Sequence, residues 1–471
     1  MDLMQRLARN VAETNYDKLP PDAVLAAKRA TLDIIGCMFA GANDCIKENQ
    51  LMRNWGGKPE APIYVLGGRL PLPHAVFLNS CAAYATDYDC GIVFHDMTCT
   101  VPVGLTVSDS CGGIRGKEYI AALAAGEDLH VRIHDSVKGD DRLKFGSFCP
   151  GSTIVLFGAA AIASKLIGLD EDGIANALGI VFGRCGGTHA LANSAAEAVH
   201  TIMALSARNG VESALLSKYG LRGMKDVLQS QHGWYNSFVP PEYRADVDLN
   251  VITDGLGEEY KITKLNKTTK RGLKLFPSCG VTHPAAVAAL LLCEEYHFDY
   301  REIASITVES AVHHNSIVGK KLTYDVGDKP VRAEAQFSQP YLIATSIIRG
   351  PAKLKDFDLE AMVDPEVVAL AKKVTPVAAK DIVTNDSRLH ITMKDGTVYS
   401  KTVRNRDVPI WPMEQVGEKF IDTVTTYGPY TISKEKAEQI VEIVDGLERL
   451  ENISVLTDLL YSERRDMHWK R

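Results

Sequence analysis

Residues 84–102 read YATDYDCGIVFHDMTCTVP, a charged segment between two runs of small and apolar residues. HAVFLNSCAAYA leads into it and VPVGLTVSDSCGG continues from it, and both runs have the composition of buried helices. The segment therefore connects two core helices: an aspartate could close the first, and Asp96 or Thr98 could open the second. The same segment could instead form a substrate pocket in which a carboxylate and an imidazole share acid and base work.

The helical pattern extends outward from this segment through residue 240. In residues 20–41, apolar side chains recur every three or four positions between proline and glycine. Residues 153–170 and 174–214 are dense in Ala, Gly and Ser, which let helix backbones approach closely. Strand-like alternation is nearly absent, so we expect a compact helical bundle without a sheet in this part.

The pattern changes near residue 245. Residues 304–312, ASITVESAV, alternate like a strand, and RLHITMKDGTVYSKTV at 388–403 predicts a hairpin that turns at Asp395-Gly396. Two helices are expected between them, and the chain is helical again after Pro412.

We therefore predict a mostly α fold with two domains. Residues 1–245 and 408–471 would form a large helical domain built from both chain ends. Residues 246–407 would form a smaller inserted α+β domain.

Composition narrows the class of protein. Hydrophobic residues make up 46% and charged residues 24% of the 471 positions, which is ordinary for a packed soluble protein. The net charge of -7 and the lack of a long basic run argue against nucleic acid or an anionic membrane as partner. No apolar run reaches the roughly 18 residues of a membrane span, and the first residues do not resemble a signal peptide. We expect a cytoplasmic protein.

The ten cysteines are scattered and form no CxxC pair. Most should be small buried hydrophobes in a reducing compartment. Clustered ligands at fixed spacing are also missing, so the sequence predicts no metal site.

Six segments in order carry a resemblance to a known family: DYD followed by HDMTCTVP, SFCPGSTIVLFGAAAIASKLIGL, ALANSAAEAVHTIMALSARNGVESALL, KLFPSCGVTH, AEAQFSQPY and MKDGTV. Together they make the chain resemble the MmgE/PrpD family, which includes 2-methylcitrate dehydratase, cis-aconitate decarboxylase and iminodisuccinate epimerase. The resemblance implies a helical domain with an α+β lid, a homodimer, and no obligatory metal or organic cofactor.

The resemblance also implies a substrate class and a set of site residues. Family members act on small di- and tricarboxylates, and their shared step looks like proton removal beside a carboxylate or its decarboxylative counterpart. Such a step needs a base, an acid and groups that stabilise an enolate-like charge. The family's acidic residue and histidine correspond to Asp87 and His95, and its lid tyrosine corresponds to Tyr324. Lys274 would clamp a substrate carboxylate.

The chain departs from the family pattern at several positions. Cys149 stands where the decarboxylases and dehydratases have histidine, and Val199 stands where a lysine is common. Gly91 aligns with a threonine, and Cys279 aligns with a histidine of the decarboxylase branch. These departures argue against a cis-aconitate decarboxylase and weaken the dehydratase interpretation.

The two thiols suggest a narrower hypothesis. Cys149 precedes a helix N-terminus, which would favour its thiolate and allow it to act as base or acid. With Cys279 or His95 on the other face of the substrate carbon, the pair would suit an epimerisation or isomerisation. The alternative is that both are inert buried thiols.

The remaining candidates are polar residues beside these positions. His283 begins a helix and could bond either the helix cap or a ligand, and we count it and Asp89 as candidate substrate-binding residues. His189 and His200 lie in helix-rich regions and are expected to be core or surface histidines.

We therefore expect an enzyme that acts on a small polycarboxylate, with a 2-methylcitrate dehydratase-like hydro-lyase favoured. The alternatives are an epimerase or isomerase of a small dicarboxylate, and a catalytically silent relative that only binds a carboxylate. The joint presence of Asp87, His95 and Tyr324 argues against the silent relative.

Overall fold

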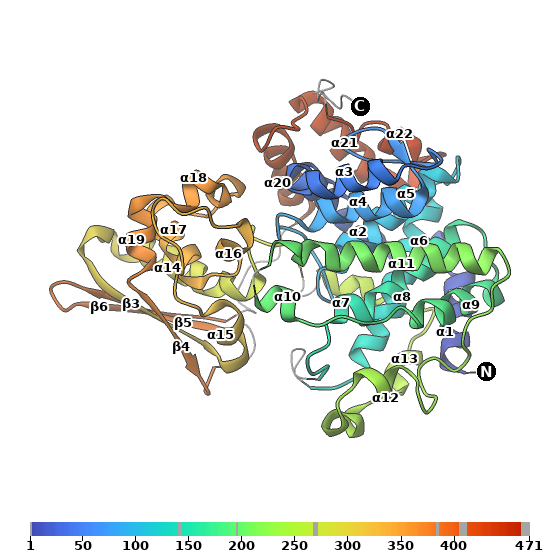
Figure 1. Cartoon of the computed structure of the whole chain (residues 1–471), viewed down its shortest axis with the longest axis horizontal. Coiled ribbons are helices and arrows are strands. Elements are labelled where there is room, and N and C mark those ends of the chain that lie inside the picture. The colour runs from blue at the N-terminus through green and yellow to red at the C-terminus, as the bar shows by residue number, and fades with distance from the viewer. Residues whose placement is uncertain are drawn as a thin grey trace.

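The structure is a computed structural model that describes residues 2–139, 144–194, 196–266, 272–382, 386–404 and 412–462. Most of these residues are helical, and both ends of the chain build one helical body (Figure 1). The helices of this body are α1 Leu3–Glu13, α2 Pro21–Gly41, α3 Ile46–Trp55, α4 Leu72–Tyr84, α5 Met97–Ser110, α6 Gly116–Asp135, α7 Pro150–Thr153, α8 Val155–Leu166, α9 Glu171–Phe182, α10 Ala190–Asn193, α11 Thr201–Lys218, α12 Trp234–Phe238, α13 Asn250–Thr253, α20 Met413–Thr426, α21 Lys434–Asp445 and α22 Ser454–Thr457.

Small residues set the close packing at the centre of the body, where α8 lies against α6 and α11. A Cβ atom added at Gly210 would lie 2.5 Å from the Cβ of Ala159, and one added at Gly158 would lie 2.3 Å from Nδ1 of His130. Neither helix contact has room for a larger side chain. The close helix approach predicted from the Ala, Gly and Ser content is present.

The prediction of no sheet before residue 240 was wrong in one detail. Two short antiparallel strands, β1 Ala61–Pro62 and β2 Arg69–Leu70, pair between α3 and α4. They are two residues long each, which is too short to show the alternation that identifies a strand in sequence.

A smaller α+β part follows the first helices and lies beside the body. Its sheet has the order β4-β3-β5-β6, in which β3 and β4 are parallel and the other pairs are antiparallel. Helices α14, α17 and α19 pack with this sheet into a separate hydrophobic core. The elements of this part are α14 His283–Tyr296, β3 Ile303–Ala311, α15 Val312–Val318, α16 Arg332–Gln336, α17 Gln339–Arg349, α18 Leu359–Met362, α19 Pro365–Ala371, β4 Val374–Ala379, β5 Ser387–Met393 and β6 Val398–Val403.

The predicted strand and hairpin are present as β3, β5 and β6, whereas β4 was not predicted. It contains Pro376, which lacks the backbone N–H that a central strand needs. The structure resolves this conflict because β4 lies at the edge of the sheet.

The predicted mostly α fold, with a body built from both chain ends, is confirmed. The C-terminal helix α20 packs along α2, and α21 also contacts α2 (Figure 1). Residues 250–253 and 261–266 contact α1, α2 and α6 of the body. The predicted boundary between residues 407 and 408, where the chain returns from the smaller part to the body, lies outside the described residues.

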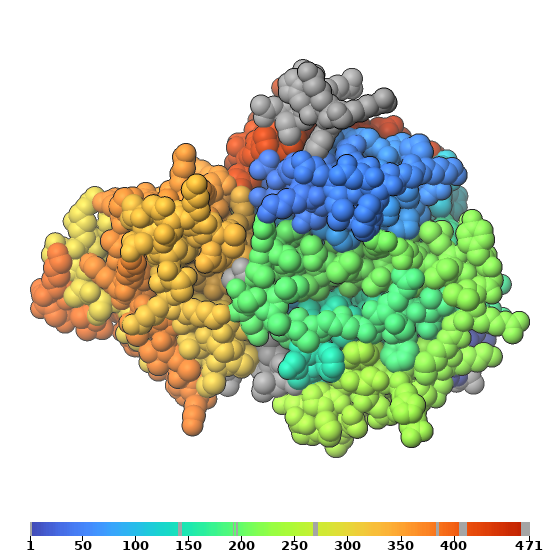
Figure 2. Space-filling model, viewed as in Figure 1, coloured from blue at the N-terminus to red at the C-terminus, as the bar shows by residue number. Residues whose placement is uncertain are grey.

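The smaller part forms a lobe beside the body in the space-filling view (Figure 2). Some apolar residues near their junction belong to the core of the body, among them Cys279, Ile317 and Phe337. No helix in the described part of the chain is both long and apolar enough to cross a membrane.

Candidate active site

The charged segment that the sequence singled out is a loop between α4 and α5, and the side chain of Asp96 holds it in shape. Its carboxylate accepts hydrogen bonds from the backbone N–H groups of Ile92 at 2.8 Å, Val93 at 2.7 Å and Met97 at 3.0 Å. Nε2 of His130 lies 3.1 Å from the same carboxylate. Asp96 therefore opens α5, as one of the two predicted caps.

Three residues of this loop have left-handed backbone angles that side chains with a Cβ rarely adopt. The φ angles are 51° at Asp87, 43° at Phe94 and 54° at His95. Such strain persists only where the surrounding contacts impose it, and it is concentrated at functional sites. Here it turns Asp87 and His95 toward each other.

Asp87, Asp89 and His95 form one cluster. Nδ1 of His95 lies 2.8 Å from Oδ2 of Asp89, and Nε2 lies 3.5 Å from Oδ1 of Asp87. Burial alone would raise the pKa of Asp89, but the positive charges of His95 and Lys274 lower it below its ordinary value. The ionised Asp89 can only accept, so Nδ1 of His95 carries a proton and donates it to this hydrogen bond.

Lys274 supplies the positive charge of this cluster from a segment 187 residues further along the chain. Its ammonium group donates to the Asp87 carboxylate, to the Asp87 backbone oxygen at 2.9 Å, and lies 3.7 Å from Asp89. Burial lowers the pKa of Lys274, but Asp87 and Asp89 raise it above the ordinary value. The lysine is therefore charged and balances one of the two negative charges of the carboxylates.

Side chains of helices α2 and α20 bind the backbone in the middle of the loop. Asp33 on α2 accepts a hydrogen bond from the Cys90 backbone N–H at 2.8 Å. Lys419 on α20 lies 2.7 Å from the Asp33 carboxylate and donates to the Tyr88 backbone oxygen at 2.7 Å. Neither residue was predicted from the sequence as part of the site, because a lone charge on a helix is usually solvated.

Tyr84 is a further residue of the site that the sequence analysis did not single out. It is the last residue of α4, and its ring lies 4.2 Å from the His95 ring between centroids. Its hydroxyl is buried and has no hydrogen-bond partner among the described residues. A tyrosine at the end of an apolar helix is typical of a core residue, so the sequence held no signal for it.

The two predicted thiols are buried near Tyr84. Burial raises the pKa of Tyr84 well above its ordinary value, and the negative charges of Asp87 and Asp89 raise it further, with smaller contributions from the nearby Cys149 and Cys279. Cys149 precedes α7, which is only one turn long, so a helix dipole gives its thiolate little support. The backbone N–H of Cys279 donates to the Gln336 backbone oxygen on α16 at 3.0 Å.

The structure places His283 near the cluster and Tyr324 in a different core. Burial, and then the charge of Lys274, lowers the pKa of His283 to about 3, so its imidazole is neutral. Its Nε2 lies 3.3 Å from the Ser278 backbone oxygen. The buried ring of Tyr324 packs against Tyr341 in the core of the smaller part. Its hydroxyl has no hydrogen-bond partner among the described residues.

His200 and His189 lie in different surroundings. His200 lies 3.0 Å from Glu48, and His189 packs edge-on against Phe94, which in turn contacts His95. His189 therefore lies nearer the cluster than expected.

Within the described residues, Asp87, Asp89 and His95 are close enough to bind one ion, but Lys274 already supplies a positive charge there.

Comparison with known proteins shows the family of the chain. Residues 5–245 match the MmgE/PrpD N-terminal domain, and residues 276–448 match the MmgE/PrpD C-terminal domain. The chain is 26% identical to the cis-aconitate decarboxylase of Aspergillus terreus, over 94% of this chain and 93% of the relative. It is 25% identical to the mouse cis-aconitate decarboxylase, over 92% and 88% of the two chains. Because both domains match in order over most of its length, the chain belongs to the MmgE/PrpD family.

Proposed function

We propose that this protein is a lyase that acts on a small di- or tricarboxylic acid by removing a proton from the carbon beside a carboxylate, as a 2-methylcitrate dehydratase-like hydro-lyase would. The observation that carries the proposal is the cluster of Asp87, Asp89, His95 and Lys274 after the end of α4, in which both carboxylates are buried. The lyase class is supported by relatives that are themselves decarboxylases.

Each member of the cluster has a role that follows from its geometry. Asp89 orients the imidazole of His95 through Nδ1, so Nε2, which faces Asp87, is the nitrogen that would exchange a proton with the substrate. Oδ2 of Asp87 is buried without a hydrogen-bond partner among the described residues, and it is the natural second proton acceptor. Lys274 would hold a substrate carboxylate and stabilise the negative charge that forms as the proton leaves.

A second candidate function is the decarboxylation of cis-aconitate, which the names of the relatives favour. The third is an epimerisation that uses Cys149 and Cys279, which is favoured by the presence of both thiols near Tyr84. These reactions differ in which bond of the substrate breaks, so a single assay can separate them.

The test is proton NMR of the protein with 2-methylcitrate, citrate, cis-aconitate and tartrate in deuterated water. We expect new alkene signals from a hydroxy acid, which would indicate dehydration. A CH2= signal with loss of CO2 from cis-aconitate would indicate the decarboxylase. Deuterium beside a carboxylate without an alkene would indicate the epimerase. No change with any acid would contradict the proposed function.

Asp89→Asn links the activity to the cluster. The amide keeps the shape of the side chain but not its charge, so the orientation and protonation of His95 change. We expect kcat/KM to fall by about 10²–10⁴. Glu438→Gln, at an exposed residue whose side chain lies 3.6 Å from Lys434, is the matched control and should leave kcat/KM unchanged.

A further inference from the structure

Tyr84 carries a polar group that the fold itself does not use. The residue is 2% exposed, and its hydroxyl has no hydrogen-bond partner among the described residues. Buried hydroxyl groups are nearly always paired, because an unpaired one loses its hydrogen bonds to water without replacement. Phenylalanine would fill the same space, so packing alone does not account for the hydroxyl.

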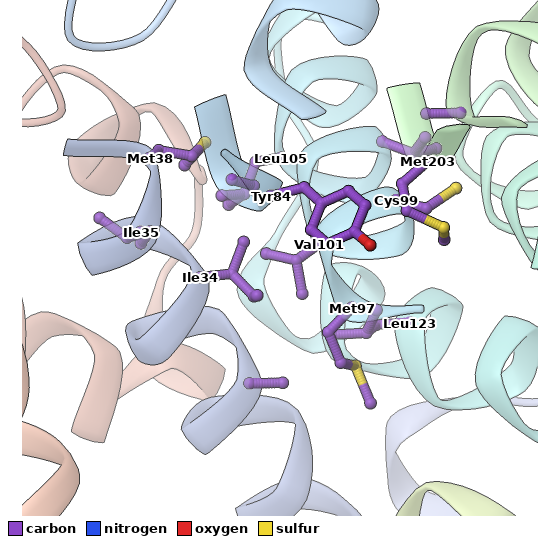
Figure 3. Packing of buried hydrophobic residues seen from close by; sticks show 14 of the residues in the cluster. Ile34, Ile35, Met38, Tyr84, Met97, Cys99, Val101, Leu105, Leu123 and Met203 are labelled. Atoms are coloured by element: carbon purple, nitrogen blue, oxygen red, sulfur yellow. The ribbon is translucent and has the colours of Figure 1, made fainter. Parts of the chain in front are cut away.

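The hydroxyl end of Tyr84 points away from the residues of α2 that pack against it (Figure 3). Figure 3 shows it turned away from Ile34 and Ile35 and toward the side of Cys99 and Met203. The Met203 sulfur lies 2.7 Å from where a Cβ on Gly151 would be, so the turn that begins at Cys149 lies on the same side.

Tyr84 lies beside the candidate site, and the charges of the site act on it. The carboxylates of Asp87 and Asp89 and the thiols of Cys149 and Cys279 all raise the pKa of its hydroxyl, after burial, which is the largest cause. The phenol therefore keeps its proton. Its ring lies against the His95 ring, with 4.2 Å between the centroids.

A neutral, buried phenol beside a base is suited to donate a hydrogen bond to a developing oxyanion. When the carbon beside a substrate carboxylate loses its proton, negative charge accumulates on the carboxylate oxygens, and a donor that is already in place stabilises it. The Asp87 and Asp89 carboxylates are acceptors, so the site needs a donor besides Lys274.

We propose that the Tyr84 hydroxyl is a catalytic hydrogen-bond donor that binds the substrate oxygen on which this charge accumulates. The inference rests on the proposed function, in which a proton is removed beside a carboxylate. Tyr84 donates a hydrogen bond and keeps its proton, while the proton from carbon goes to His95 or Asp87.

The test is Tyr84→Phe, which removes only the hydroxyl oxygen. We expect kcat/KM to fall by about 10²–10³, mainly through kcat, because one oxyanion donor is lost. The melting temperature should stay the same or rise, because no hydrogen bond within the protein is lost and an unpaired polar group is removed.

Tyr119→Phe is the matched control. Tyr119 is also a fully buried tyrosine of the body, but its hydroxyl lies 2.8 Å from the Thr31 hydroxyl. Its removal breaks a hydrogen bond away from the site, so we expect the opposite pattern: a lower melting temperature and unchanged kcat/KM.

Two other outcomes would overturn the role of Tyr84 alone or the proposed function as a whole. Activity of Tyr84→Phe within twofold of the wild type, or a loss of activity that follows a loss of stability, would overturn the role of Tyr84 and leave the proposed function intact. A wild-type protein that converts none of the four acids would overturn the proposed function, and the donor role with it.

Discussion

The loop of residues 85–96, here called the reactive loop, ends at Asp96. Asp96, Glu127 and His130 form a fully buried group of ionisable side chains. Nε2 of His130 lies 3.1 Å from Asp96 and 3.4 Å from Glu127, and Nδ1 lies 3.1 Å from the Gly126 backbone oxygen. Because Asp96 binds the backbone of the loop, the protonation of this group is coupled to the position of His95. It is a positioning device rather than part of the reaction.

This group predicts that stability falls as the pH rises. Burial, opposed by the charge of His130, raises the pKa of Glu127 to about 8, and Glu127 and Asp96 raise that of His130 against the effect of burial. The unfolded values are 4.5 and 6.5. The folded protein therefore binds more protons than the unfolded chain, and the free energy of unfolding decreases between about pH 5 and pH 8.

Glu127→Gln tests this assignment through urea unfolding at pH 5, 6.5 and 8. A neutral amide replaces a carboxyl that is largely protonated at neutral pH, so we expect the variant to show a flatter dependence on pH. Thr100 can still donate to the amide oxygen as it does to the carboxylate. Parallel curves for the variant and the wild type would show that Glu127 does not titrate in this range.

At the scale of residues, the sequence could predict the groups that lie close along the chain. Asp87, Asp89 and His95 lie within nine positions, so one loop can bring them together. Lys274 reaches them from far along the chain, and only the resemblance to a family pointed to it. Tyr84 could not be predicted, because its role depends on a missing hydrogen-bond partner, which is a property of the packed structure.

At the scale of elements, the loop depends on a buried ion pair between α2 and α20. The Lys419 side chain is 5% exposed and that of Asp33 is fully buried. Burial lowers the pKa of Lys419, but the charges of Asp33 and Tyr88 raise it above its ordinary value. The pair thus attaches the C-terminal helix to the backbone of the reactive loop.

Lys419→Met leaves Asp33 as a buried charge without its ion-pair partner. We expect the free energy of unfolding to fall by about 3–5 kcal/mol in urea titrations. Asp33→Asn combined with Lys419→Met should recover at least half of this loss, because no charge is then left unpaired. Lys401→Met, at an exposed pair with Glu295, should leave the urea midpoint nearly unchanged. A double variant as unstable as the single one would contradict this account.

The helices and strands that could be predicted were those whose residue pattern extends over many positions. The long helices and the Asp395-Gly396 hairpin follow from periodicity and turn chemistry, which act locally. Strand β4 and the ribbon of β1 and β2 are defined by pairing with other segments, and their sequences are short or interrupted by proline.

At the scale of the whole molecule, the helical body and the smaller part meet beside the site. Arg332, the first residue of α16, lies 3.5 Å from Asp44 of the body and 3.2 Å from Asp358. A hollow of about 260 Å³ at this junction is lined by Ala85, the first residue of the reactive loop, and by Gln336 on α16. Contacts of Arg332 should therefore control how firmly the site is closed.

Arg332→Met removes these contacts, and hydrogen exchange can measure the consequence. We expect amides of α16 and of residues 42–45 to exchange roughly 5–30-fold faster, as a loss of about 1–2 kcal/mol implies, and KM to rise more than kcat falls. Arg388→Met breaks two ion pairs within the sheet instead, with Glu309 and Asp381. It should affect exchange in β5 and leave α16 unchanged. Equal exchange of α16 in wild type and Arg332→Met would mean that apolar packing alone, around Cys279, Ile317 and Phe337, holds the two parts together.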